Sequence, residues 1–160
     1  MKKEYTCKNL DLEHMQIAIN LAKTAYKLGE VPVGAIVVKV ISRAYNIKES
    51  RQNALFHAEL LAINEACKKL GNWRLEGCSL YVTLEPCPMC YGAIINARIE
   101  RIILEAFDPK AGCHGSLVNL PSYGFNHSPN ILGGIMECEC TNLLIAFFKK
   151  LRQKNNVKND

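Results

Sequence analysis

The sequence has no long hydrophobic run. Nowhere among its 160 residues do about 18 apolar residues follow one another, which is the length that a membrane-spanning helix requires. The first residues, MKKEYTCKNLDLEH, also lack the apolar stretch that follows the positive charges of a secretory signal peptide. We therefore expect a soluble, cytoplasmic protein with no membrane-bound segment.

Internal repeats, low-complexity segments and linker-like stretches are also absent. The length is near that of one ordinary domain, and the 49% content of hydrophobic residues is enough to form a buried core. We predict a single domain that spans residues 1–160.

Cysteine, in contrast, is abundant. Eight cysteines in a chain without an export signal are typical of reduced thiols and metal ligands, because the cytosol keeps thiols reduced. Four of them are isolated in the sequence, and we interpret these as small buried hydrophobic residues: Cys7, Cys67, Cys78 and Cys113.

Hydrophobic periodicity predicts alternating helices and strands. Apolar residues recur at helical spacing in segments that we predict as helices over 11–28, 57–70, 88–96 and about 135–151, the first with Asp11 as its cap. Segments rich in β-branched residues predict strands over 79–83 and 101–107 and a hairpin within 31–46. Such alternation favours an α/β layer whose sheet is at least partly parallel.

Two connections in this pattern are unusual. The hairpin has no residue that favours a tight turn, since Lys39 and Val40 offer neither glycine nor asparagine. The segment 108–130 is long and irregular, and a loop of that length in a compact domain is usually functional or disordered.

Positive charge is concentrated at the carboxyl terminus. Residues 149–160 carry five basic side chains and one acidic side chain, so most of the net charge of +5 lies in this basic tail. Such a segment suits a polyanionic partner, and it is equally compatible with a solvated helix end.

Two short motifs contain candidate metal ligands. HAE over residues 57–59 and PCPMC over residues 86–90 each lie at the start of a predicted helix. A helix start lowers the pKa of a cysteine, and the two-residue spacing lets Cys87 and Cys90 bind one ion, with His57 as a third ligand. Three protein ligands leave the fourth tetrahedral position of zinc open for water, which is typical of a catalytic site.

Glu59 is the candidate acid–base group, because it lies two residues from His57 and faces the place of such a water. The alternative is a closed structural zinc site with a fourth cysteine, which Cys113, Cys138 or Cys140 would supply. Cys138 and Cys140 lie within the last predicted helix, where side chains two residues apart point in different directions. The open site is therefore favoured.

Further motifs extend over nearly the whole chain: VPVGAIVV, AYN, HAE, GNWRL, LYVTLEPCPMCYGAI, ARIERI, DPKAG, GSL, FNH, and EC followed by LLIAFFKKLR. Together they resemble the bacterial tRNA-specific adenosine deaminases of the cytidine deaminase-like superfamily, which convert the wobble adenosine to inosine. Cytidine and guanine deaminases share the zinc motifs but not the later set. The resemblance is therefore specific to the tRNA enzymes.

The resemblance implies a three-layer α/β/α fold with a central mixed five-stranded sheet and helices on both faces. It also implies one zinc ion (Zn2+) per chain, a tRNA anticodon stem-loop as partner, and a homodimer. The implied reaction is hydrolysis of a cyclic amidine C–N bond, in which zinc-bound hydroxide attacks adenine while Glu59 moves the protons.

The resemblance also implies roles in substrate binding for individual residues. Asn46 would contact the flipped base, and Asp108 would lie in an RNA-contacting loop. The remaining matches are to residues that line the anticodon channel or reach the anticodon-loop backbone: Asn126 and His127 for the channel, and Lys149, Lys150 and Arg152 for the backbone. From the residues alone, Asn46 is as well suited to close a strand and Asp108 to open a turn.

Two features depart from the family pattern. Between Val38 and Asn46 the chain is about three residues shorter than its relatives, so either the hairpin is unusually tight or turn residues are missing from the sequence. Pro88 in the cysteine motif also occurs in guanine deaminases. The alternatives are a deaminase of free guanine or cytidine, which would need no basic tail, and a non-catalytic zinc-stapled RNA-binding module, which would need no Glu59.

Overall fold

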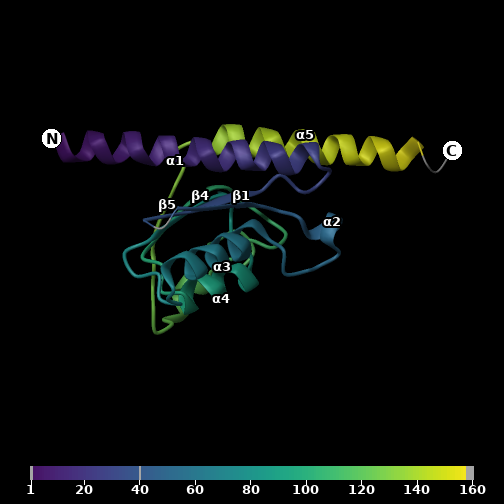
Figure 1. The fold of residues 1–160 in the computed structure, drawn as a ribbon. Coiled ribbons are helices and arrows are strands. Elements are labelled where there is room, and N and C mark those ends of the chain that lie inside the picture. The colour runs from purple at the N-terminus through teal and green to yellow at the C-terminus, as the bar shows by residue number, and fades with distance from the viewer. Residues whose placement is uncertain (1, 40, 158–160) are drawn as a thin grey trace.

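A mixed five-stranded sheet forms the centre of the computed structural model, which describes residues 2–39 and 41–157 (Figure 1). The strands are β1 (Gly34–Val38), β2 (Ser42–Tyr45), β3 (Ser79–Leu84), β4 (Arg101–Ala106) and β5 (Asn130–Gly133), in the order β2-β1-β3-β4-β5. β1 pairs with β2 and β3 in antiparallel fashion, whereas β3–β4 and β4–β5 are parallel. The predicted partly parallel sheet is confirmed.

Helices cover both faces of this sheet (Figure 1). The long helices α1 (Lys2–Lys27) and α5 (Glu137–Val157) lie on one face, and α3 (Ala58–Leu70) and α4 (Pro88–Asn96) lie on the other. The short helices α2 (Lys48–Arg51) and η1 (Leu120–Tyr123) lie in connections. The expected three-layer α/β/α arrangement is therefore present. In the described part of the chain, no helix combines the length and the apolar character needed to cross a membrane.

The strands alternate between two apolar clusters. Ala35 and Val37 of β1 pack with α3 and α4, whereas Ile36 between them packs with Met15 and Ile19 of α1. Because helices cover both faces of the sheet, side chains that point to either face are shielded from solvent. This explains why β1 is apolar along its whole length.

The first helix is longer than the periodicity indicated. The prediction that it begins at Asp11 is wrong, because α1 already begins at Lys2. Asp11 is buried within it and accepts a hydrogen bond from the Tyr81 hydroxyl at 2.5 Å, while its other oxygen lies 3.3 Å from Arg101. Asp11 thus ties α1 to β3 and β4 instead of capping a helix. The side chain of Cys7 lies outside the described residues.

The hairpin closes without a favourable turn residue. Val37 pairs with Ser42, and Lys39 and Ile41 in the turn adopt positive φ angles of 96° and 46°. Non-glycine residues rarely adopt such angles, and Ile41 is β-branched, so this tight turn is strained. Val40, the remaining turn residue, lies outside the described residues.

Two connections after strands place Cys87 and His57 at the same edge of the sheet. Cys87 follows β3 and immediately precedes α4, while His57 is reached from β2 through α2 and immediately precedes α3. Both helix starts lie near the carboxyl ends of the parallel strands, the edge at which α/β proteins commonly bind ligands.

Candidate active site

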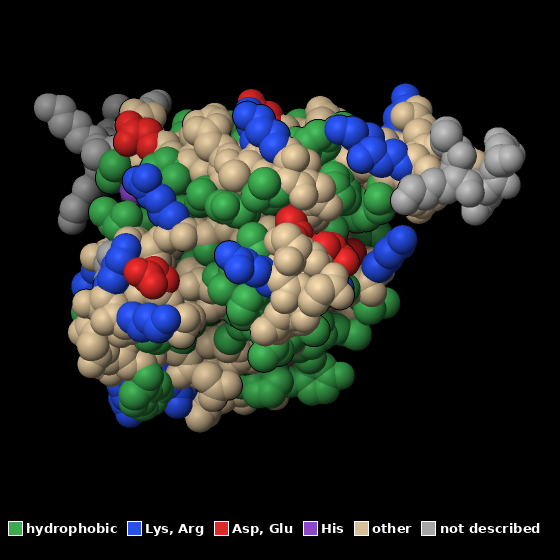
Figure 2. Space-filling view, turned by 45° about the vertical axis from the view of Figure 1, so that its right-hand side comes forward, with side chains coloured by type: hydrophobic (Ala, Val, Ile, Leu, Met, Phe, Trp, Pro, Cys, Tyr) green, Lys and Arg blue, Asp and Glu red, His purple; other side chains and the backbone are tan. Residues whose placement is uncertain are grey.

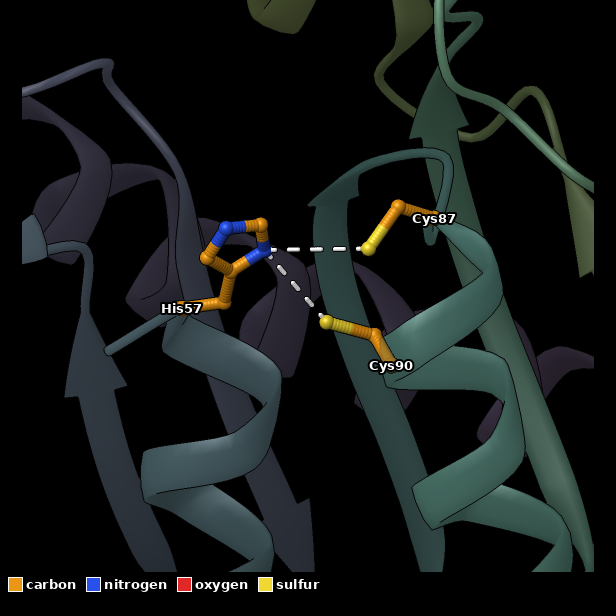
Figure 3. A group of neighbouring side chains, drawn as sticks. All are labelled: His57, Cys87 and Cys90. Atoms are coloured by element: carbon orange, nitrogen blue, oxygen red, sulfur yellow. Dashed lines mark hydrogen bonds between the residues drawn. The ribbon is translucent and has the colours of Figure 1, made fainter. Parts of the chain in front are cut away.

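Three candidate ligands converge between the starts of α3 and α4 (Figure 3). His57 Nδ1 lies 3.5 Å from Cys90 Sγ and 3.8 Å from Cys87 Sγ. Within the described side chains, this is the one group of three or more potential His, Cys, Asp or Glu ligands whose atoms lie within 4.8 Å of one another. Cys113, Cys138 and Cys140 are not part of it.

Local backbone structure positions these side chains. His57 and Cys87 are the residues that precede the first turns of α3 and α4, and both have extended backbones. Neither side chain caps its helix; instead Asn46 Oδ1 accepts the N–H of Ala58 at 2.8 Å. The imidazole and thiol groups are therefore free to face one another. Cys90 follows one turn later along α4, on the same face.

The electrostatics of the group suit a divalent cation. A hydrogen bond from Cys90, supported by one with His57, lowers the pKa of Cys87 to about 4, and the same bond between the two sulfurs raises the pKa of Cys90. The pair therefore favours negative charge on Cys87, and a doubly charged ion bound between the sulfurs would allow both to become thiolates.

The spacing also fits zinc. Tetrahedral zinc with bonds of about 2.0–2.3 Å holds a nitrogen and a sulfur ligand roughly 3.6 Å apart. The observed separations of 3.5 and 3.8 Å lie on either side of this value. The donor set fits one zinc ion per chain, held by three protein ligands.

Glu59 lies in the first turn of α3 and is 4% exposed. Burial raises the pKa of its carboxyl to about 7, against the opposing effects of its own backbone N–H and of His57. Glu59 lines the same cavity as His57 and Cys87 without belonging to the ligand group.

That cavity has a volume of about 540 Å³, within the range of sites for small molecules. Its walls come from residues near β1, from the segment after β4 and from one face of α5, together with the ligand region. Residues of the wall include Val31, Val33, Asn46, Lys48, Phe107, Asp108, Lys110, Ala111, Thr141, Ile145, Phe148 and Arg152.

Three of the predicted substrate-binding residues line this cavity: Asn46, Asp108 and Arg152. Asn46 is buried and already uses its oxygen on Ala58, so its amide nitrogen is the free polar group. Asp108 Oδ1 accepts the N–H groups of Lys110 at 2.9 Å and Ala111 at 3.2 Å. Asp108 therefore shapes a turn in the cavity wall, as the sequence alone also allowed.

The other four predicted substrate-binding residues do not line the cavity: Asn126, His127, Lys149 and Lys150. Asn126 contacts Arg98 and His127 contacts the carbonyl of Ile99, both just beyond the carboxyl end of α4. Cys87 is at the opposite end of this nine-residue helix, about 13 Å away along its axis. Lys149 is exposed on α5, and Lys150 Nζ lies 5.4 Å from the ring centroid of Tyr26 on α1.

Several residues of the cavity were not predicted. Thr141, Ile145, Phe148 and Arg152 form one helical stripe, and their spacing of three to four residues would have indicated it. Lys48 lies in α2, a helix that the periodicity missed because it has only four residues. Phe107 was predicted as the last residue of a strand, but β4 ends at Ala106. Lys110 comes from the irregular segment, whose sequence gives no period from which to place it.

Comparisons with known proteins extend these observations. Residues 8–106 match the family model for the cytidine and deoxycytidylate deaminase zinc-binding region. The chain is 52% identical to the tRNA-specific adenosine deaminase of Bacillus subtilis (strain 168), over 90% of this chain and 92% of the relative. It is 47% identical to the enzyme of the same name from Aquifex aeolicus (strain VF5), over 89% and 95% of the two chains.

The chain belongs to the family of tRNA-specific adenosine deaminases. A solved structure from a study of A-to-I editing by tRNA:A34 deaminases is similar to it at 37% identity, with a TM-score of 0.76 over 83% of this chain and 99% of that one. Guanine deaminase from Nitrosomonas europaea is 19% identical with a TM-score of 0.73, over 84% and 82% of the two chains, which shows the shared fold alone. The expected cytidine deaminase-like fold is thereby confirmed.

Proposed function

We propose that the chain hydrolyses adenosine to inosine and ammonia at the wobble position of a tRNA anticodon. The observation that carries this proposal is one cavity that holds a zinc-fitting ligand group, the buried Glu59, and residues matched to RNA contacts, in a chain 52% identical to a tRNA-specific adenosine deaminase. The proposed reaction exchanges the 6-amino group of adenine for an oxygen atom from water.

His57, Cys87 and Cys90 would hold the zinc ion through Nδ1 and the two sulfurs. Zinc in such a site supplies Lewis acidity that brings the pKa of water toward neutrality. The thiols must stay reduced to serve as ligands, and we therefore place the reaction in the cytoplasm.

Glu59 would move the protons. Its carboxylate takes one proton from the attacking water and delivers it to ring nitrogen 1 of adenine. It then takes the proton left on the new C6 hydroxyl and gives it to the departing amine, so that the C6 carbonyl forms as the C–N bond breaks and ammonia leaves. The side chain is suited to this because it is buried in the cavity wall at the level of His57, where bulk water does not compete for the proton. The free amide nitrogen of Asn46 would bind an acceptor on the nucleotide.

Basic residues at the cavity would bind the RNA backbone. Lys48, Lys110 and Arg152 line it from three separate elements. Figure 2 shows further Lys and Arg side chains along the carboxyl-terminal part of α5 at the upper right. Phosphate contacts of this kind position a single-stranded loop without reading its sequence.

We also propose that the chain acts as a homodimer. The segment 117–125 exposes Leu117, Tyr123 and Phe125, and Met89 is exposed at the start of α4. Monomers rarely expose large apolar patches, so a second copy is a suitable cover. Because Asn126 directly follows this segment, a dimer would let it reach RNA bound to the partner. Light scattering should then give twice the chain mass, and a monomeric mass for fully active protein would contradict the dimer.

Deamination of free guanine is the second candidate. It is favoured by a 36% identity to a solved guanine deaminase from Bacillus subtilis, which has a TM-score of 0.56 over 59% of this chain and 63% of that one. Its substrate would occupy the same cavity without any need for basic residues from α5.

The experiment that separates the candidates supplies zinc-loaded protein with an anticodon stem-loop RNA, with free guanine and with free cytidine. We expect inosine in the RNA and no ammonia from the two free substrates. Removal of zinc by a chelator should abolish the activity, and added zinc should restore it. Ammonia from guanine without inosine in the RNA would overturn the proposal.

A further inference from the structure

One buried carboxylate at the cavity holds the neighbouring part of the cavity wall in place. Glu85 follows β3, is 2% exposed, and accepts the backbone N–H groups of Asp108 at 3.0 Å, His114 at 2.7 Å and Ser116 at 3.2 Å. The Ser116 hydroxyl donates to it as well. Its partners thus all lie in residues 108–116, which we call the rim segment.

The rim segment is wrapped closely around this carboxylate. A Cβ atom added at Gly112 would lie 2.2 Å from Glu85 Oε2 and 2.6 Å from the carbonyl oxygen of Asp108. Only glycine therefore fits at this point. The two oxygens of Glu85 accept hydrogen bonds from three backbone N–H groups and one hydroxyl of the segment, so the side chain is the acceptor around which the segment folds.

The same stretch of chain carries a metal ligand. Glu85 N donates to the Ala106 carbonyl at 2.7 Å, which fixes it to the end of β4. The carbonyl of the following residue, Pro86, accepts two hydrogen bonds from Cys113: one from its N–H at 3.1 Å and one from its thiol at 3.0 Å. Cys87 follows directly. The ligand-bearing stretch and the rim segment are therefore joined at two consecutive residues, Glu85 and Pro86.

We propose that Glu85 is a positioning residue that sets the distance between the rim segment and the metal ligands, and so orients the base in the cavity. The rim segment supplies the cavity wall from Asp108 to Ala111. Glu85 lines the cavity beside it, but its oxygens are occupied by hydrogen bonds from the rim segment, so it acts on the substrate through that segment. This inference rests on the proposed function, because it concerns the substrate of the same site.

The test is Glu85→Gln. An amide in place of the carboxylate presents an NH2 group to the N–H donors of the rim segment, so at least one hydrogen bond is lost and one donor faces another. Hydrogen exchange of the amides of Asp108, His114 and Ser116 should become faster, while amides in α3 and α4 remain protected. Zinc content should not change.

For the anticodon stem-loop, the KM of Glu85→Gln should rise roughly tenfold or more, with a smaller change in kcat, because a displaced wall weakens binding in the ground state and the transition state alike. Simple destabilisation would instead reduce the fraction of active protein, which lowers the apparent kcat and leaves KM unchanged. Glu85→Asp, which keeps a carboxylate that can accept these hydrogen bonds, should bring the KM part of the way back toward the wild-type value.

Two further variants act as controls. Glu105→Gln changes another fully buried glutamate, on β4, whose carboxylate binds the N–H of Met136 at 2.9 Å, and it should leave rim-segment exchange and KM as in the wild type. Gly112→Ala pushes the rim segment away from the carboxylate and should reproduce the effect of Glu85→Gln. The double variant should be no worse than either single change, because both break the same contact.

The outcomes separate this inference from the proposed function. If the wild type forms inosine and Glu85→Gln keeps the wild-type KM and the wild-type exchange rates, the positioning role is overturned. If the exchange rates rise as expected but the wild type forms no inosine in any anticodon stem-loop, the contact is supported as a structural tie and the proposed function fails instead.

Discussion

His114 is half-buried beside the ligand-bearing stretch, with its ring centroid 4.6 Å from that of Tyr91 on α4. Burial lowers the pKa of its imidazole to about 4. As the pH falls, the unfolded chain therefore binds a proton before the folded chain does. The neutral His114 therefore contributes fully to the free energy of unfolding above pH 6.5, the ordinary pKa of histidine. This contribution is lost as the pH falls toward 4.

The variant His114→Phe keeps a ring against Tyr91 and removes the titration. Both proteins lose free energy of unfolding when the pH is lowered from 7 to 4.5. The loss should be smaller for the variant than for the wild type by about 1–2 kcal/mol, a value reduced to allow for the partial exposure of the ring. Denaturant unfolding measures the free energy of unfolding of each protein at both pH values. Subtracting the decrease in the variant from the decrease in the wild type removes the effect of metal loss in acid, which both proteins share. Equal losses in the two proteins would show that His114 does not contribute.

At the scale of single residues, part of the candidate site could be predicted and part could not. His57, Cys87 and Cys90 could be identified because metal ligands have characteristic spacings and lie at predicted helix starts, and the structure brings them together. Their roles stay predictions. Glu85 could not be identified, because a glutamate beside a proline shows nothing of the segment it binds some thirty residues later.

Among the elements, α1 and β1 approach each other closely at Gly34. A Cβ atom added at Gly34 would lie 2.0 Å from the carbonyl oxygen of Ala18 and 2.7 Å from the nitrogen of Ala22. Gly34→Ala should therefore lower the free energy of unfolding by about 1–3 kcal/mol, because the helix must move away from the sheet. Thermal unfolding of the zinc-bound protein measures this effect.

Gly92→Ala is the matched control. Gly92 lies within α4, and nothing is within 4 Å of a Cβ atom added there. Alanine favours a helix over glycine by roughly 0.5–1 kcal/mol, so this variant should be unchanged or slightly more stable. Similar destabilisation by the two substitutions would contradict the close approach of α1 to β1.

Most elements could be predicted from local sequence. The segment 88–96 coincides with α4, and 79–83 falls within β3, because each has a clear apolar period and a definite boundary residue. The start of α1 could not be placed, since residues 2–10 lack an apolar stripe and Asp11 looks like a cap when its partners on β3 and β4 are unknown. The short strand β5 escaped notice because its residues are mostly exposed.

At the scale of the whole molecule, α5 presents different faces to different partners. Arg152 faces the cavity, whereas Lys150 packs on Tyr26 of α1. Arg152→Ala should reduce the slope of log affinity against log salt for an anticodon stem-loop by about 0.7, the value for one lost phosphate contact on a single strand. Lys150→Ala removes the same charge and should change the slope less. Equal slopes would mean that net charge alone governs RNA binding.

The overall architecture could be predicted further than the assembly. The alternation of helices and strands favoured an α/β sheet, and the family resemblance supplied its three layers. A single domain over residues 1–160 stays a prediction, as does the homodimer. Neither can be derived from periodicity, because both depend on which exposed apolar surfaces meet.

Glu59 is the residue to which we assign the proton transfers in the deamination of an anticodon adenosine. The most direct measurement is the inosine formed at that adenosine by the wild type and by Glu59→Gln, with zinc content and RNA affinity determined on the same samples. We expect zinc and affinity to be retained and turnover to fall by about 10² to 10⁴ or more, the usual worth of general acid–base catalysis. Inosine formation by Glu59→Gln near the wild-type rate would contradict the claim.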